Sequence, residues 1–363
     1  MSDSAYGTMS RLLHRLALAS PFVAQASHDL ESLLNQRRVS PDRVPPDRVL
    51  PDRRPTDSNR HVFITGLARA GTTVLMRSLY QSGQFRSLTY RDMPFVLMPS
   101  TWSGISSLFR RHKAQEERAH GDRVMVDFDS PEAFEEVFWR SFCGSDYIFE
   151  EFLRPHGPDE EIIAQFRRFV SNVLASDGAA DRHCYLSKNN NNLLRLTALS
   201  EAFPKAAIVI PFRDPVQHAL SLKRQHELFL QTHARDSFSL DYMNWLGHHE
   251  FGKNHRPFRF GEVDFGRNSY GRETLDYWLE TWVDAYSYVL RNLPRNGLLV
   301  SYERLCGQTD SELERLLAHA GLSAGAWAEQ VRFLKAKPHD APDQSSQLSK
   351  RAYEVHAELC QME

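Results

Sequence analysis

Residues 61–77 read HVFITGLARAGTTVLMR, and this stretch decides the fold of the chain. It predicts a short apolar strand, then a loop bounded by glycines, then a helix that begins on two threonines. Gly66 and Gly71 enclose four residues, which is the spacing of a phosphate-binding P-loop. Because the free amides at the start of a helix attract anions, the stretch predicts a phosphate site.

Position 72 holds threonine where the P-loop of a nucleoside-triphosphate enzyme holds lysine. That lysine reaches the β- and γ-phosphates during phosphoryl transfer. Without it, the loop can hold a phosphate but is poorly equipped to stabilise transfer of a γ-phosphoryl group. The basic side chain here is Arg69, inside the loop. We therefore expect a phosphate-containing nucleotide that donates some other group.

The composition is typical of a globular protein. The chain has 363 residues, 41% of them hydrophobic and 25% charged, which suits one large α/β domain with insertions. Its net charge of −2 creates no field that would favour nucleic acid as a partner. No apolar run is long enough for a transmembrane segment, and the N-terminus lacks a secretory pattern. The four scattered cysteines form no CxxC pair, which indicates a reducing, cytoplasmic compartment.

Three parts of the chain differ in pattern. Residues 1–40 carry apolar side chains at helical spacing, and Pro21 should divide them into two helices docked on the main domain. Residues 41–58 repeat Pro-Asp-Arg and read as a linker. Residues 59–363 alternate strands and helices, which predicts an α/β fold with a central parallel sheet flanked by helices. Insertions near 100–180 and 232–275 are expected to form the acceptor site.

Basic residues follow two further strands of this predicted sheet. Lys188 ends the strand beginning at Cys184, and Arg213 follows the continuous apolar strand 207–212. Ser221 lies eight residues beyond Arg213, about two turns into the next helix. Because ligands bind beyond the carboxyl ends of parallel strands, these side chains are expected on the ligand edge with Arg69.

Several carboxylates are candidates for proton transfer. Asp92 follows the first β-α unit, beside Arg91. Asp92 is either part of an ordinary surface ion pair with Arg91 or, more specifically, a general base. Ser130-Pro131 resembles a helix start, which would place Glu135 and Glu136 on a helix surface, although a catalytic role stays open.

These motifs resemble those of a known family, the sulfotransferases that use 3′-phosphoadenosine 5′-phosphosulfate (PAPS). The resemblance is to the bacterial and tyrosylprotein branch of that family. The loop 66–73 resembles their phosphosulfate-binding loop. Residues 210–215 with Ser221 resemble their 3′-phosphate motif, and Lys188 resembles their strand-end lysine. Tyr302-Glu303-x-Leu305 is similar to the segment that ends their nucleotide domain. Four such motifs in the right order, over residues 60–305, are a strong signal.

The resemblance implies transfer of a sulfuryl group from PAPS to a hydroxyl or amine acceptor, with release of 3′,5′-diphosphoadenosine (PAP) and no metal. Arg69 and Lys188 would stabilise charge on the leaving group. Arg213 and Ser221 would bind the 3′-phosphate. The residues implied to bind the nucleotide are Arg69, Ala70, Gly71, Thr72, Thr73, Arg213, Ser221 and Tyr302. Ala68 and Ala70 depart from the family pattern, where proline and serine are frequent.

The family's carboxylate branch places its base shortly after the first helix, where this chain has Asp92. We expect Asp92 to take the acceptor's proton and Arg91 to keep it ionised. Glu135, Glu136 and His120 are next in line. A phenol, a lipid, a sugar and a peptide tyrosine all fit as acceptors, and the sequence leaves a homodimer open.

Two other functions compete with this hypothesis. A P-loop kinase for a small metabolite would require lysine at position 72, which is threonine here. A nucleotide-binding protein without catalytic activity would have no need for the complete set of Arg69, Lys188, Arg213 and Ser221.

Overall fold

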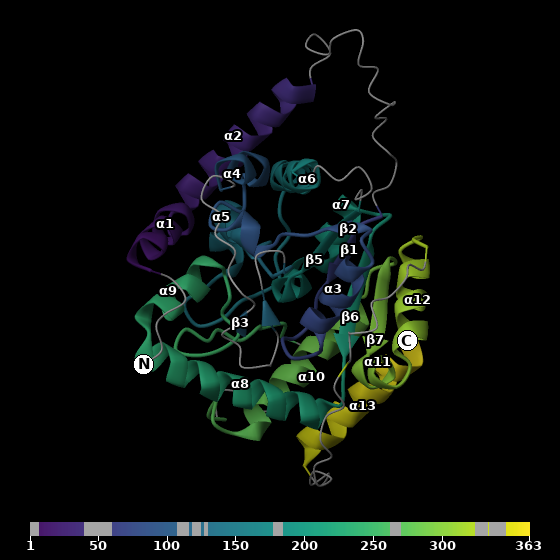
Figure 1. The fold of residues 1–363 in the computed structure, drawn as a ribbon. Coiled ribbons are helices and arrows are strands. Elements are labelled where there is room, and N and C mark those ends of the chain that lie inside the picture. The colour runs from purple at the N-terminus through teal and green to yellow at the C-terminus, as the bar shows by residue number, and fades with distance from the viewer. Residues whose placement is uncertain are drawn as a thin grey trace.

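The computed structural model describes residues 7–39, 60–106, 116–117, 125–126, 130–176, 184–261, 270–323, 333 and 346–363. Its centre is a five-stranded sheet in the order β2-β5-β1-β6-β7 (Figure 1). All of its neighbouring strands run parallel. This confirms the predicted fold class, a parallel sheet flanked by helices. The strands are β1 (Val62–Ile64), β2 (Phe85–Arg86), β5 (Cys184–Lys188), β6 (Ala207–Phe212) and β7 (Gly297–Ser301).

Side chains alternate between the two faces of the sheet, as strand geometry requires. Val62 and Ile64 pack on one face with α3 (Thr72–Gln81) and α12 (Thr309–His319). Phe63 points to the opposite face, into the larger core. That core contains side chains of α5 (Glu136–Tyr147), α6 (Glu160–Ala175), α7 (Leu196–Ala202), α8 (Pro215–Arg235), α10 (Leu275–Asn292) and α13 (Gln347–Met362). The sheet is therefore buried on both faces.

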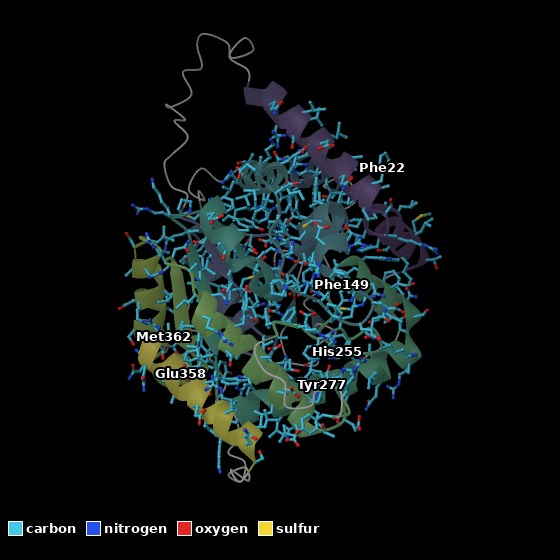
Figure 2. All side chains as sticks on the ribbon, turned by 180° about the vertical axis from the view of Figure 1, so that it is seen from behind. Phe22, Phe149, His255, Tyr277, Glu358 and Met362 are labelled. Atoms are coloured by element: carbon cyan, nitrogen blue, oxygen red, sulfur yellow. The ribbon has the colours of Figure 1, made fainter. Side chains whose placement is uncertain are left out.

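The N-terminal segment forms two helices, as predicted, with the break at Pro21. They are α1 (Thr8–Leu18) and α2 (Pro21–Val39), and α2 packs along α5 and α6 (Figure 1). Glu31 of α2 is fully buried, and its carboxylate accepts hydrogen bonds from the backbone N–H groups of Ser100 and Thr101. These amides lie in the first turn of α4 (Pro99–Ser106), so α2 caps that helix. Phe22, by contrast, points away from the body (Figure 2).

The remaining elements complete the body around this core. They are α9 (Ser237–Trp245), α11 (Tyr302–Gly307), a short antiparallel pair of β3 (Glu116–Glu117) and β4 (Met125–Val126), and the 3-10 helices η2 (Tyr90–Asp92) and η4 (Asn190–Arg195). The linker predicted at 41–58 and His120 lie outside the described residues. Among the helices described, none is long and apolar enough to span a membrane.

The helix start predicted at Ser130-Pro131 is wrong. Pro131 instead pairs with Thr89 in an isolated antiparallel bridge, and α5 begins five residues later, at Glu136. The backbone N–H of Glu132 donates to the carbonyl oxygen of Leu88, at 3.1 Å. Residues 130–132 therefore extend the chain beside 88–90, and this tertiary pairing outweighs the local helix signal of a serine followed by proline.

Buried histidines are frequent in this fold. Eight of the described histidines are at most 5% exposed, and burial lowers the pKa of each one. The pKa falls to about 4 in His61, His226 and His249, and to about 3 in His218 and His255. The folded chain therefore keeps these five rings neutral at pH values where an unfolded histidine is protonated.

We predict that the free energy of unfolding falls as the pH is lowered from 7.5 to 5.5. Below about pH 6.5, histidines in the unfolded chain bind protons, whereas the buried rings of the folded chain stay neutral. By pH 5.5 this difference lowers the free energy of unfolding by about 1 kcal/mol per ring. Urea unfolding at both pH values measures the change. His61→Asn, whose amide oxygen can still accept from Tyr185, should reduce the pH dependence by about one proton. Equal stability at both pH values would contradict the prediction.

Candidate functional site

The loop after β1 contains three residues with positive φ angles. Gly66 has φ of 143°, Arg69 has φ of 71° and Gly71 has φ of 89°. Arg69 is the only residue other than glycine with a positive φ among the described residues, and this conformation costs an L-residue roughly 1 kcal/mol. The loop then enters α3 at Thr72, with Gly71 as its N-cap. The free amides of that first turn therefore face the carboxyl edge of the sheet, where the sequence predicts a phosphate.

Tyr302 lies directly against this loop. A Cβ atom added at Gly71 would lie 2.6 Å from the Tyr302 ring, so both the backbone angle and the ring require glycine there. The guanidinium carbon of Arg213 lies 4.8 Å from the centre of the same ring, in a cation–π contact. The ring thus contacts both the loop and a cation.

The two arginines and the serine predicted from sequence come together here. Nε of Arg69 donates to Oγ of Ser221 at 3.3 Å, and Nη1 of Arg213 donates to the carbonyl oxygen of Arg69 at 3.4 Å. Arg213 is only 9% exposed, and its Nε has no hydrogen-bond partner in the described chain. An unpaired buried N–H is costly, so this donor is suited to an anionic ligand.

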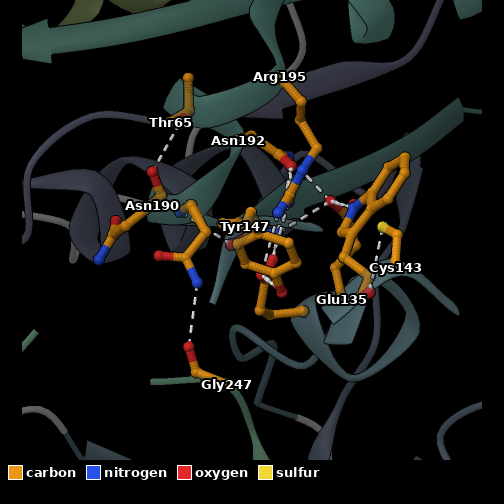
Figure 3. Close-up of polar contacts among 12 residues, drawn as sticks. Thr65, Glu135, Cys143, Tyr147, Asn190, Asn192, Arg195 and Gly247 are labelled. Atoms are coloured by element: carbon orange, nitrogen blue, oxygen red, sulfur yellow. Dashed lines mark hydrogen bonds and ion pairs between the residues drawn. The ribbon is translucent and has the colours of Figure 1, made fainter. Parts of the chain in front are cut away.

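The end of β5 lies beside the same loop. Lys188 pairs in register with Ile64, the last residue of β1. The turn after it is tied back to β1, because Oγ1 of Thr65 donates to the carbonyl oxygen of Asn190 at 3.2 Å (Figure 3). Lys188 therefore lies at the same edge as the phosphate loop, as predicted.

Glu250, in the predicted insertion near 232–275, faces this edge. Nδ2 of Asn190 donates to Oε1 of Glu250 at 2.9 Å. Burial acts to raise the pKa of this carboxyl, but His248, Lys188 and the hydrogen bonds from Asn190 and the backbone together outweigh it and hold the pKa below its ordinary value. Glu250 is thus an ionised carboxylate near the strand-end lysine.

A closed polar network lies behind the strand ends (Figure 3). Glu136 and Arg195 form an ion pair at 2.9 Å with both side chains fully buried. Tyr147 donates to Oε1 of Glu136, and Nδ2 of Asn189 donates to Oε2 at 2.7 Å. Burial acts to raise the pKa of Glu136, but the Arg195 guanidinium and the hydrogen bonds from Tyr147 and Asn189 together outweigh it, so the pKa is lowered.

Glu135 belongs to the same network. Its carboxylate accepts from the Tyr185 hydroxyl at 3.1 Å and from Nδ2 of Asn192 at 2.8 Å. The expectation that Glu135 and Glu136 lie on a helix surface is therefore wrong, since the two are 1% and 0% exposed. Their carboxylates accept hydrogen bonds from the asparagines of the turn after β5, and these bonds hold the turn in place.

Asp92 has a different ion-pair partner from the one expected. Nη2 of Arg86, on β2, donates to its Oδ1 at 2.7 Å, and the backbone N–H of Thr89 donates to Oδ2 at 2.7 Å. Thr89 and Asp92 form a capping box around the 3-10 helix η2. The predicted partner Arg91 is exposed, whereas Asp92 is 4% exposed. The carboxylate therefore fastens the turn after β2 with both of its oxygens.

Sequence reasoning missed two groups of residues. Glu250 stands in a segment of histidines and aromatic residues, and no spacing links it to Lys188. Asn189, Asn192 and Arg195 could have been found, because four consecutive asparagines directly after a strand are unusual and suggest dense side-chain hydrogen bonding. Among the described residues, no group of three or more histidine, cysteine, aspartate or glutamate side chains could hold a metal ion.

A family profile described as "Sulfotransferase family" matches residues 61–328. Among solved structures, a sulfotransferase from Alicyclobacillus acidocaldarius is 16% identical, with 83% of this chain and 94% of that chain covered and a TM-score of 0.43. Sulfotransferase STF1 from Mycobacterium tuberculosis is 13% identical, with 98% and 83% covered and a TM-score of 0.46. A search of the curated proteins found no match.

We predict that Asp92→Asn lowers the free energy of unfolding by about 3 kcal/mol, because it leaves Arg86 buried without its counter-charge. Urea unfolding at pH 7.5 measures the change. Asp146→Asn, at an exposed position, is the matched control and should alter stability by less than about 0.5 kcal/mol. Equal stability of the two variants would show that the Arg86–Asp92 pair does not fasten this turn.

Proposed function

This chain belongs to the sulfotransferase family, and we propose that it transfers a sulfuryl group from PAPS to an acceptor hydroxyl and releases PAP. One observation carries the proposal. The phosphate loop, Arg69, Arg213 and Ser221 converge on one edge of the sheet, where Nε of Arg213 is buried without a partner among the described residues.

The residues at this edge fit a ligand with two anionic ends. The amides and hydroxyls of Thr72 and Thr73, together with the amides of Ala70 and Gly71, would hold the phosphosulfate at the start of α3. Arg213 and the Ser221 hydroxyl would bind the 3′-phosphate, with charge-assisted hydrogen bonds from the guanidinium. Tyr302 supports both parts through its contacts with Gly71 and Arg213. When bound, PAPS supplies the activated sulfuryl group and its leaving group.

Two cations are placed to lower the barrier. Negative charge grows on the bridging oxygen of the leaving group during transfer, and donors fixed near that oxygen stabilise the transition state more than the ground state. Arg69 is held in the loop by its backbone and by Ser221. Lys188 is held by the register of β5 with β1. We assign these two side chains to the stabilisation of that charge.

The two rival functions are less well supported. A kinase needs a cation on the β- and γ-phosphates, and position 72 offers the hydroxyl of threonine. A binding protein without activity would have no reason to keep Arg69 in a costly left-handed conformation within reach of Ser221.

We predict that PAP and PAPS raise the melting temperature by a few degrees at a hundredfold excess over their Kd, because a ligand at that excess adds about 2.7 kcal/mol to stability. Thermal unfolding monitored by fluorescence measures the shift, and ATP with Mg²⁺ is the matched control. Transfer of radiolabelled sulfate from PAPS to metabolites of the native host then tests the reaction. A shift with ATP and Mg²⁺ but none with PAP would refute the proposal in favour of a kinase.

We predict that Arg213→Ala weakens PAP binding by about 10- to 100-fold, because it removes charge-assisted hydrogen bonds to a phosphate. Isothermal titration calorimetry gives the Kd. Arg224→Ala removes an exposed arginine of α8, the helix that follows Arg213, and should leave the Kd unchanged. If both variants bind PAP as the unaltered protein does, the 3′-phosphate is bound elsewhere.

A further inference from the structure

A pocket opens beside the phosphate loop. Leu67 and Ala68 of the loop form one wall. The other walls come from segments far apart in sequence, and they are largely apolar. The pocket is lined by Leu67, Ala68, Leu153, Leu222, Glu250, His255, Arg256, Pro257, Phe258, Trp278 and Thr281. Such a pocket suits an apolar or aromatic ligand fixed by a few polar groups.

Three of its four polar side chains are unable to take a proton from a ligand. Nδ1 of His255 lies 3.3 Å from the carbonyl oxygen of His249 and must donate to it, so Nε2 accepts from the Tyr277 hydroxyl at 2.8 Å (Figure 2). Both ring nitrogens are therefore in use, and burial lowers the pKa of this imidazole to about 3.

The next two are excluded by their chemistry. Arg256 is a permanent cation with donors alone. The Thr281 hydroxyl donates its proton to the carbonyl oxygen of Tyr277 at 2.9 Å and is far too weak a base. Among the lining side chains, Glu250 is thus the one whose chemistry is that of a base.

The position of Glu250 relates it to the transfer chemistry. Asn190, which bonds its carboxylate, follows Lys188 by two residues and is itself tied to Thr65, one residue before the loop. Glu250 therefore lines the pocket and is hydrogen-bonded to the turn that follows Lys188. His248, Lys188 and the hydrogen bond from Asn190 together hold the pKa of this carboxylate below its ordinary value, against the effect of burial. Asp92, by contrast, has both carboxylate oxygens engaged by Arg86 and Thr89.

We infer that Glu250 is the base of this reaction, and that the acceptor is a hydroxyl on an apolar or aromatic body seated in the pocket beside Leu67 and Ala68. The inference rests on the proposed function. As the acceptor oxygen bonds to sulfur, its proton passes to the Glu250 carboxylate. The bond from sulfur to the bridging phosphate oxygen breaks, and its electron pair leaves with PAP. Glu250 then loses the proton to solvent.

Transfer from radiolabelled PAPS to 2-naphthol, an apolar phenol, tests both parts, with glucose as the polar comparison. We expect transfer to 2-naphthol and none to glucose. Glu250→Gln should lower kcat by 10²- to 10⁴-fold, the range for loss of a general base. Its Kd values for PAP and 2-naphthol, measured by calorimetry, should stay within threefold. Glu250→Asp keeps a carboxylate and should recover part of the lost rate, which a merely structural role would not predict.

Asp241→Asn, at an exposed position on α9, is the matched control and should keep the full rate. Melting temperatures of all variants separate loss of the base from loss of the fold. A Glu250→Gln enzyme with unchanged kcat overturns the assignment of the base, and an Asp92→Asn enzyme that folds but loses all transfer returns that role to Asp92. Preference for glucose, or PAP binding without transfer to 2-naphthol, overturns the acceptor class alone. Failure to bind PAP at all refutes the proposed function itself.

Discussion

The buried ion pair of Glu136 and Arg195 is the constraint on which the site depends. Two charges with no exposure to water are stable only when every remaining hydrogen-bonding position is occupied. Tyr147, Asn189 and Asn192 provide those partners around the pair. Because the asparagines belong to the turn after β5, their bonding fixes where that turn leaves the sheet. The positions of Lys188 before it and of Asn190 within it follow from this closed network.

The donor and acceptor sides of the proposed site are built differently. The donor side uses short segments in which a strand, a turn and a helix follow one another, so each side chain is placed by local geometry. The acceptor side draws its walls from Leu153, Phe258 and Trp278, on three separate segments. Its shape is therefore a product of how the helical excursions pack on the sheet. The first arrangement favours a fixed ligand, and in the second the phosphate loop contributes one wall, formed by Leu67 and Ala68.

This difference explains what the sequence could predict. The sheet, the loop and the convergence of Arg69, Arg213 and Ser221 were predictable, because strand ends and helix starts can be recognised locally. The partner of Asp92 was not, since Arg86 reaches it across a capping box that local charge spacing does not reveal. The burial of Glu135 and Glu136 was also hidden, because it depends on contacts 50 and 59 residues away in sequence. The position of Glu250 at the pocket could not be predicted either, because it depends on how the segment 232–275 packs on the sheet.

Asn190 has a consequence for how the two sides communicate. Its backbone carbonyl is bonded to Thr65, next to the loop, and its side-chain amide is bonded to Glu250 at the pocket. One residue therefore joins the two halves through hydrogen bonds. Through such a link, binding at one site can alter binding at the other, and thermodynamics requires any such dependence to be mutual. If a bound nucleotide changes the affinity for the acceptor by some factor, a bound acceptor must change the affinity for the nucleotide by the same factor.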